Sequence, residues 1–343
     1  AVWIWGQTVR EQGAEQVAER LAAARIDTAL VLIKGLAGRT SFASSVAIKP
    51  QPGVDVLGEL LKACHPRGIR VEAWVMFHGD SEWVKAHPDE AAHSCGLDPN
   101  GRGPTRASDE KVCPAAPGYR DYLKRLMRGL ATDYPVDGLH LDGIRYPSLA
   151  SCFCERHRAK AKAAGIDFEK VRQAAAKSVH QPAARDHYVQ LYQQGDTNIK
   201  AWVDLRREEI DSFVRETAEL LKATRPTALL SAALMPEGAE DNDAFALCHY
   251  AQDYRTIGQA CDYICPMSYH ASFDKPAIWP ADVAARAMSR SGHPVLAGIQ
   301  AFDPSTPAHL GEALGELERR NLPGFVLFSY NAMTSERWAQ LGK

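Results

Sequence analysis

One stretch of the sequence is more informative than any other: Val136-Asp-Gly-Leu-His-Leu-Asp-Gly-Ile-Arg-Tyr-Pro147. Its apolar residues alternate with other residues, which predicts a short buried strand. The strand ends in a group of polar residues that includes Asp142 and Arg145, and Pro147 stops it. A carboxylate at the end of a buried strand costs folding free energy unless it pairs with a positive or hydrogen-bonding group, so such a carboxylate often serves a function. Because active sites of parallel α/β barrels lie at that end, the stretch predicts both a fold and a catalytic acid.

Strand-like and helix-like segments alternate along the whole chain. Eight segments have the apolar character of strands: Val2–Trp5, Thr28–Ile33, Ile69–Phe77, Leu139–Ile144, Leu229–Leu234, Tyr263–Cys265, Val295–Ile299 and Phe325–Phe328. Helical spacing is found between or after them, over Ala14–Arg25, Val54–Cys64, Tyr119–Tyr134, Lys200–Thr224 and Ser335–Leu341. This order predicts an α/β fold, a (β/α)8 TIM barrel, as one catalytic domain over residues 1–343. A doubly wound open sheet is the competing layout, but no G-x-G-x-x-G follows the first strand.

Two connections in this layout are unusually long. A Gly- and Pro-rich loop is expected after the third strand, roughly from His78 to Pro117. A helical insertion, residues 148–198, is expected after the fourth strand. Long connections at the active-site end of a barrel suit a polymeric substrate better than a small metabolite.

Composition excludes several kinds of partner. The chain has 343 residues and a net charge of −2, with no basic stripe, so nucleic acid is not an expected partner. No apolar run approaches the roughly 20 residues of a membrane span. The sequence opens at Ala1 without Met or a signal peptide, which favours a secreted or periplasmic chain whose signal peptide has been removed, with trimming as the alternative. Eight cysteines suit disulfides in an oxidising compartment, although their spacing assigns no pairs, and the oligomeric state stays open.

The residues that follow the strands should meet at one mouth of the barrel. Besides Asp142 they are mostly aromatic or polar: Trp5, Lys34, Trp74, His78, Arg145, Glu237, Tyr269, His270, Gln300, Asp303 and Tyr330. Aromatic rings stack on sugar rings, and polar groups bind the hydroxyls. Two carboxylates are the usual machinery for hydrolysing a glycosidic bond. The sequence therefore predicts a glycoside hydrolase that acts on an oligo- or polysaccharide and needs no cofactor.

Four segments resemble the uncharacterised barrel proteins known as family 10 glycosyl-hydrolase-like proteins. The resemblance lies in Asp137–Pro147 for the fourth strand, Val71–Val75 for the third, Asp262–Tyr269 for the sixth and Gly324–Tyr330 for the eighth. Cys152-Phe-Cys154 also recurs in such proteins. The resemblance covers nearly the whole chain and implies the same fold and a glycosidase-like activity, without identifying the sugar.

Two better-known groups suggest roles for the carboxylates. In α-amylase-like barrels an Asp after strand four is the nucleophile, a Glu after strand five is the acid/base, and a third Asp follows strand seven. By strand order, that resemblance assigns these roles to Asp142, Glu237 and Asp303. The fourth strand also resembles the D-G-x-D-x-D-x-E motif of chitinase-like barrels, but His140 and Ile144 replace its middle Asp and its Glu. A substrate-assisted chitinase mechanism is therefore not expected.

Several residues leave alternatives open. Arg145 is expected to pair with Asp142 and lower the pKa of its carboxyl group. Asp303 precedes a proline and also suits a simple turn. His140 is a further candidate substrate contact; it could instead orient Asp142 or be a core histidine with its partners in the protein. Lys34 suits a solvent edge or a substrate contact, and a Schiff-base lyase or aldolase is the alternative function that it suggests. A catalytically inactive glycan-binding barrel is the other alternative.

The segment Cys152-Phe-Cys154-Glu-Arg-His157 contains three candidate metal ligands. A structural zinc site needs a fourth ligand, which Cys113 or Cys95 could supply from a distance. Disulfides or free buried thiols are the preferred interpretation, with a structural metal as the alternative. No H-E-x-x-H is present, so the sequence lacks this signature of a metal-dependent hydrolase.

Overall fold

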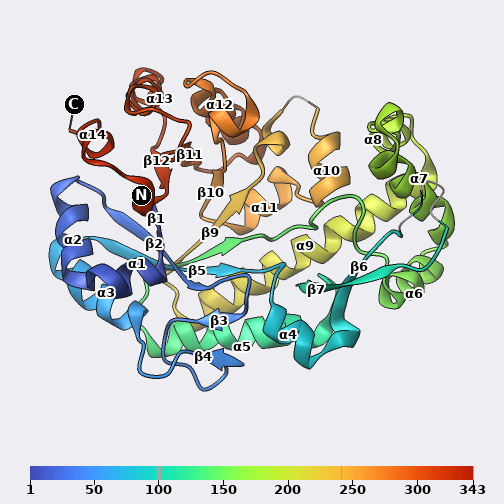
Figure 1. Cartoon of the computed structure of the whole chain (residues 1–343), viewed down its shortest axis with the longest axis horizontal. Helices are drawn as coiled ribbons and strands as arrows, with labels where there is room; N and C mark the ends of the chain where they lie inside the picture. The colour runs from blue at the N-terminus through green and yellow to red at the C-terminus, as the bar shows by residue number, and fades with distance from the viewer. Residues whose placement is uncertain (97, 99–101, 241, 343) are drawn as a thin grey trace.

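The computed structural model is an eight-stranded parallel barrel with helices around it (Figure 1). The structure describes residues 1–96, 98, 102–240 and 242–342. The barrel strands are β1 (Val2–Trp5), β2 (Thr28–Lys34), β5 (Arg70–Met76), β8 (Gly138–Asp142), β9 (Leu229–Leu234), β10 (Tyr263–Pro266), β11 (Ala297–Gln300) and β12 (Phe325–Phe328). Hydrogen bonding runs continuously from β10 through β9, β8, β5, β2, β1 and β12 to β11. A parallel bridge between Ile264 and Val295 nearly closes the ring, and the predicted TIM-barrel class is confirmed.

The helices that connect or follow these strands cover the outside of the barrel. They are α1 (Gly6–Gln12), α2 (Ala14–Ala23), α3 (Val56–Cys64), α5 (Pro117–Asp133), α9 (Thr197–Thr224), α11 (Tyr254–Ala260), α12 (Trp279–Ser291), α13 (Pro307–Arg319) and α14 (Ser335–Trp338). Some helices begin where the sequence supplies a cap. The side chain of Asp196, for example, accepts the backbone N–H groups of Asn198 and Ile199 and so fixes the start of α9.

Side chains of the barrel strands alternate between two apolar layers. In β5, Val71, Ala73 and Val75 join the core between strands and helices, while Trp74 and Met76 join the core inside the barrel. The same alternation in β8 sends Leu139 and Leu141 outward. His140 and Asp142 therefore face the barrel interior, as the alternation in the sequence predicts.

The connection after β5 is more ordered than predicted. Instead of an irregular loop it contains α4 (Ser81–Ala86) and an antiparallel pair, β6 (Ala91–Ser94) and β7 (Arg106–Val112). The exposed, mostly polar residues of β7 hide this strand from a search for apolar runs. A smaller strand pair, β3 (Arg39–Thr40) and β4 (Lys49–Pro50), follows β2.

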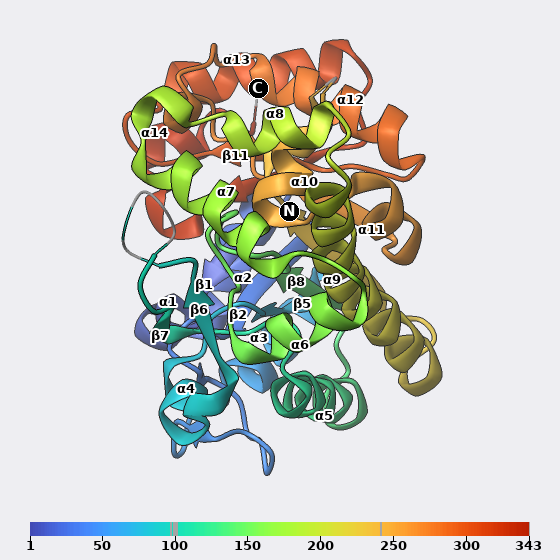
Figure 2. The same cartoon turned by 90° about the vertical axis from the view of Figure 1, so that its right-hand side faces the viewer.

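The insertion after β8 forms three helices, α6 (Glu155–Ala163), α7 (Phe168–His180) and α8 (His187–Gln193). They share a separate apolar cluster with the start of α9 and with α10 (Ala244–Tyr250), and Phe153 stacks on Trp202 within it. Figure 2 shows α6, α7 and α8 in front of the barrel strands. No helix of the described residues is both long and apolar enough to cross a membrane.

Candidate active site

Asp142 is the last residue of β8, and its side chain is held by two N–H groups. The indole Nε1 of Trp74 donates to Oδ2 (3.1 Å), and the backbone N–H of Gly143 donates to Oδ1 (2.5 Å). Burial raises the pKa of the carboxyl group, and Arg145, Gly143 and Trp74 oppose that rise. The expected lowering of this pKa is therefore wrong in direction, because loss of water outweighs the nearby positive charge.

Glu237 lies in the short helix η4 (Pro236–Ala239), immediately after β9. The hydroxyl of Tyr250 donates to its Oε1 (3.2 Å), while its Oε2 is buried without a hydrogen-bond partner among the described residues. Burial raises the pKa of the Glu237 carboxyl group, against smaller opposing effects of Tyr250 and Arg145. One oxygen is thus fixed, and the other is free to carry a proton.

Arg145 forms no ion pair or hydrogen bond with Asp142 or Glu237 among the described residues, so the expected pairing with Asp142 is not found, but its positive charge lowers the pKa of both carboxyl groups. Its guanidinium lies 6.0 Å from the ring centre of Tyr250, the residue that binds Glu237. Gln252 bonds both the segment that follows Asp142 and the segment that precedes Glu237. Its amide N–H donates to the carbonyl of Ile144 (3.2 Å), and its oxygen accepts the backbone N–H of Met235 (3.0 Å).

His78 is a buried neighbour of the same group. Its Nδ1 lies 3.1 Å from the carbonyl oxygen of Gly143, so Nδ1 carries the hydrogen and Nε2 is left as an acceptor. Burial, with the charges of Arg145 and Lys111, lowers the pKa of the imidazole to about 3. The ring is therefore neutral at physiological pH.

Aromatic side chains at or just after five barrel strands form a continuous wall at this mouth, made of Trp5, Trp74, Tyr269, Phe302 and Phe328. Trp5 and Trp74 have ring centres 5.5 Å apart, and Tyr269 stacks on Phe328 at 5.1 Å. Trp5 is 38% exposed, and a pocket of about 360 Å³ opens beside it at the ends of β1 and β2. A larger groove of about 950 Å³ lies along α13 and contains none of the predicted site residues.

Lys34 does not lie at a solvent edge, and that expectation is corrected. Its side chain is 0% exposed, and Asp80 pairs with its ammonium at 3.1 Å. The same ammonium donates to the hydroxyl of Tyr119 and to the carbonyl groups of Met76 and Gly79. These partners leave no hydrogen of the ammonium for a substrate.

His140 belongs to a hydrogen-bonded chain inside the barrel. Trp3 donates its indole N–H to Nε2 (2.9 Å), and Nδ1 lies 2.8 Å from the hydroxyl of Ser231. Ser231 in turn donates to Glu72 (2.7 Å), which also accepts the hydroxyl of Tyr263 (2.7 Å). Both ring nitrogens of His140 are used within the protein. This is the arrangement of a core histidine with its partners in the protein, and it leaves neither ring nitrogen for the predicted substrate contact.

Three other predicted site residues are bonded to other parts of the protein. Gln300 is fully buried and bonds the backbone at Ala271, Ser272 and Phe302. Tyr330 donates to Gln12 and packs against Trp338. Asp303 is 94% exposed and pairs with Arg337 (2.7 Å). In the part of the chain that the structure describes, no contact joins Asp303 to Asp142 or Glu237.

His270, a predicted substrate contact, is buried, with 3% of the residue exposed. It lies in the short helix η5 (His270–Phe273), next to the ring of His309 at 5.4 Å. Both of its ring nitrogens are buried without a hydrogen-bond partner in the described structure. Its pKa is lowered by burial and by His309, so the ring is a neutral polar group.

Sequence reasoning missed four residues of this mouth. Tyr250 and Gln252 reach Glu237 and its loop from a helix end 13 or more positions away, and no pattern in the sequence marks them. Phe302 and Phe328 belong to the aromatic wall. Phe328 could have been found, because it alternates with Val326, whose side chain lies inside the barrel.

Solved structures of glycoside hydrolase barrels are similar to this fold. The glycoside hydrolase domain of PgaB (BpsB) from Bordetella bronchiseptica has a TM-score of 0.74 at 14% identity, over 96% of this chain and 94% of that one. The catalytic domain of β-amylase from Paenibacillus polymyxa gives 0.61 at 10% identity, over 98% and 94%. A class V chitinase from Pseudomonas fluorescens gives 0.56 at 12% identity, over 99% and 97%. At these identities the likeness concerns the fold alone.

The sequence itself places the chain in a family. No curated protein matches it. Residues 27–301 match the model of the family described as Glycosyl hydrolase-like 10, and this range runs from the start of β2 to the end of β11. The range covers most of the barrel and includes Asp142 and Glu237. The chain therefore belongs to the Glycosyl hydrolase-like 10 family.

Proposed function

We propose that the protein hydrolyses glycosidic bonds of an oligo- or polysaccharide with Asp142 and Glu237 as its carboxylate pair. The observation that carries this proposal is their common neighbour: Asp142 is buried and Glu237 is half-buried at the ends of adjacent strands, and the positive charge of Arg145 lowers the pKa of both carboxyl groups. Membership of a glycosyl hydrolase-like family supports the reaction class.

The surroundings of the two carboxyl groups suit different roles. Burial raises the pKa of both carboxyl groups, but each oxygen of Asp142 accepts an N–H group, which opposes that rise and favours the ionised form that a nucleophile or base requires. Glu237 has one oxygen without a partner and a raised pKa, which favours the protonated form of a general acid. Asp142 is therefore the proposed nucleophile or base, and Glu237 the proposed acid.

The aromatic wall supports a sugar as the substrate. Trp5 exposes part of its ring next to Trp74, whose indole N–H holds Asp142. A sugar ring that stacks on Trp5 would lie near the proposed nucleophile, and the neutral Nε2 of His78 would accept a hydroxyl. The connection after β5 and the insertion after β8 would border a groove long enough for a polymer.

The Schiff-base alternative receives no support from the surroundings of Lys34. A lysine nucleophile must reach a carbonyl group of the substrate. The ammonium of Lys34 is buried and held by Asp80 and Tyr119. A lyase or aldolase is therefore not proposed.

The test is a glycan panel with three variants. The wild-type protein is expected to release reducing ends from one class of glycan. Asp142→Asn and Glu237→Gln should each lower kcat by about 10²–10⁴-fold and retain binding in calorimetry. Asp303→Asn is the matched control and should keep near-wild-type turnover, because its carboxylate is exposed and paired with Arg337.

Two results would contradict the proposal. Full turnover by Asp142→Asn would show that Asp142 is not one of a catalytic carboxylate pair. Binding of a glycan by the wild type with no cleavage of any panel member would instead identify a glycan-binding barrel. If cleavage occurs, NMR of the product anomer gives the spacing of the pair. Retention corresponds to carboxyl groups about 5–5.5 Å apart and inversion to roughly 6.5–9.5 Å.

A further inference from the structure

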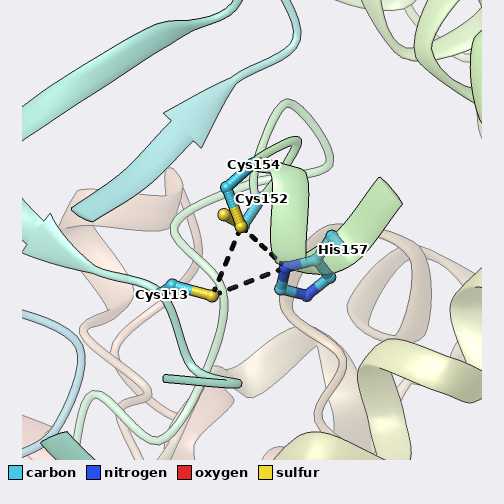
Figure 3. A group of neighbouring side chains, drawn as sticks. All are labelled: Cys113, Cys152, Cys154 and His157. Carbon is cyan, nitrogen blue, oxygen red and sulfur yellow. Dashed lines mark hydrogen bonds between the residues drawn. The ribbon is translucent and has the colours of Figure 1, made fainter. Parts of the chain in front are cut away.

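Four buried side chains from separate parts of the chain meet beside the active-site loops: Cys113, Cys152, Cys154 and His157 (Figure 3). Cys113 follows β7, the two other cysteines precede α6, and His157 lies in the first turn of α6. Their exposed fractions are between 0 and 4%. One sulfur or nitrogen atom of each lies within 4.8 Å of those of the other three. The sequence places two cysteines and the histidine close together, and folding supplies the third cysteine.

The spacing of three of these atoms matches the edges of a metal tetrahedron. The sulfurs of Cys113 and Cys154 are 3.7 Å apart, and each lies 3.4 Å from Nδ1 of His157. Zinc binds thiolate sulfur at about 2.3 Å and imidazole nitrogen at about 2.0–2.1 Å. A regular tetrahedron with those bond lengths has S–S edges of about 3.8 Å and S–N edges of about 3.5 Å. The side chains are therefore already arranged around a position that a zinc ion would fit.

We propose that Cys113, Cys152, Cys154 and His157 bind one zinc ion in a structural site. Three thiolates and an imidazole are a ligand set that selects zinc over magnesium or calcium. Four protein ligands complete the tetrahedron and leave no position for water or substrate, which makes the site structural rather than catalytic. Binding converts each thiol to a thiolate and releases its proton to solvent, so no oxidant or reductant is needed.

The other nitrogen of His157 is oriented as a metal-bound histidine requires. Its Nε2 lies 2.8 Å from the hydroxyl of Tyr146. A ligating Nδ1 leaves the hydrogen on Nε2, where Tyr146 accepts it and fixes the ring. Three thiolates around Zn²⁺ leave one net negative charge, and the positive charge of Arg156 acts on Cys113 and Cys154. Arg156 thus offsets the negative charge of the proposed site, and Tyr146 satisfies the free N–H of the histidine ligand.

The position of the site suggests what the ion does. Cys113 belongs to the connection after β5, whereas Cys152 and Cys154 belong to the connection after β8, so the ion would join the two segments that border the proposed groove. Tyr146 extends this link, because it follows Arg145 directly and its backbone N–H donates to the carbonyl of Tyr250 (3.0 Å). The proposed ion thereby fixes the loop that carries Arg145.

The first measurement is the metal content of the protein purified without chelator. We expect close to one zinc per chain by mass spectrometry of metals. Replacement with Co²⁺ should give the visible bands of a tetrahedral ion together with thiolate-to-cobalt charge transfer. Neither readout depends on glycosidase activity, so a failure here is distinct from a failure of the proposed function.

Two variants test the ligands. Cys154→Ser should lose the bound zinc and the cobalt bands. Cys95→Ser is the matched control, since Cys95 is a buried free thiol near the same insertion but outside the group of four, and it should retain both. If Cys154→Ser fails to fold, the zinc content and the cobalt spectrum of the wild-type protein alone test the proposal.

Three results would overturn the proposal. The first is wild-type protein that holds no zinc as purified and takes up none from zinc solution. The second is a disulfide between Cys113 and Cys154 in peptides from unreduced protein, because it would use two of the four ligands. The third is equal loss of metal from Cys95→Ser and Cys154→Ser.

Discussion

His78 packs against Gly143 so closely that position 143 has no room for a side chain. A Cβ atom built on Gly143 would lie 2.2 Å from Nδ1 of His78, the atom that bonds the Gly143 carbonyl oxygen. The residue also has a φ of +63°, which favours glycine. Since the N–H of Gly143 holds Asp142, one small residue links His78 to the proposed nucleophile.

Gly143→Ala is expected to reduce both stability and turnover. The left-handed backbone alone should cost about 1–3 kcal/mol in free energy of unfolding. Displacement of His78 and of the Asp142 carboxylate should lower kcat at least tenfold further, by a misalignment of reacting groups. Urea unfolding and initial rates measure the two effects separately.

Gly165→Ala is the matched control for this substitution. Gly165 has a similar φ of +68°, but a Cβ there meets no atom within 4 Å. We expect the same order of stability loss with unchanged kcat. Equal kcat values for the two variants at matched folded fractions would show that the His78 contact has no role in turnover.

Arg145→Met should shift the pH profile of kcat/KM to higher pH. The positive charge of Arg145 lowers the pKa of both Asp142 and Glu237, so its removal raises both. Asp142 must lose its proton on the acid limb, and Glu237 must keep its proton on the alkaline limb. Both limbs of the profile therefore move to higher pH. Rates measured across pH in one buffer series report both limbs.

The exposed Arg125 offers a control for the loss of a positive charge. It pairs with Asp121 on α5, and Arg125→Met should leave both limbs in place. A profile of Arg145→Met that falls in height without moving would mean that Arg145 binds substrate and does not set the two pKa values.

Trp5→Ala should weaken substrate binding more than it slows the chemical step. Trp5 is the most exposed residue of the aromatic wall, so a sugar would stack on it without displacing its neighbours. We expect KM to rise about tenfold, which corresponds to about 1.4 kcal/mol, with kcat changed by less than about threefold. Trp5→Phe keeps a stacking face and should recover most of the affinity. A lowered kcat at unchanged KM would contradict a binding role.

The sequence was sufficient to locate the eight barrel strands because their apolar pattern is local. β1, β9 and β12 have the predicted limits, and β8 ends at Asp142, two residues early, because Gly143 adopts a positive φ. Asp142 could also be found, since a carboxylate at the end of a buried strand is unusual whatever surrounds it.

The polar residues that proved structural could not be separated from Asp142 by sequence. Lys34 and His140 also lie on strands of the barrel, and only distant partners distinguish them. Lys34 is neutralised by Asp80 on the next long connection, and His140 is bound by Trp3, 137 positions earlier. The sequence also could not tell whether Cys113 or Cys95 lies beside Cys154. Cys113 does so because of the way the β6–β7 strand pair folds back on the insertion. All eight cysteines are buried and none forms a disulfide in the described structure, so the disulfides that the cysteine content suited are not found.

Glu72 should make the protein less stable as pH rises toward neutrality. Its carboxyl group is fully buried between Ser231 and Tyr263, and burial raises its pKa from 4.5 to about 7. Between these values the folded chain holds more protons than the unfolded chain, so the free energy of unfolding falls with increasing pH. The fall amounts to about 3 kcal/mol when complete and ends above pH 7.

Glu72→Gln removes this titration while keeping an oxygen and a hydrogen-bond donor near Ser231 and Tyr263. Its free energy of unfolding, measured in urea from pH 5 to pH 8, should therefore rise relative to that of the wild type as pH increases. Glu219→Gln, on the exposed side of α9, should run parallel to the wild type over the same range. If the Glu72→Gln curve also runs parallel, Glu72 keeps the same charge throughout, and the hydrogen bonds from Ser231 and Tyr263 must then offset its burial.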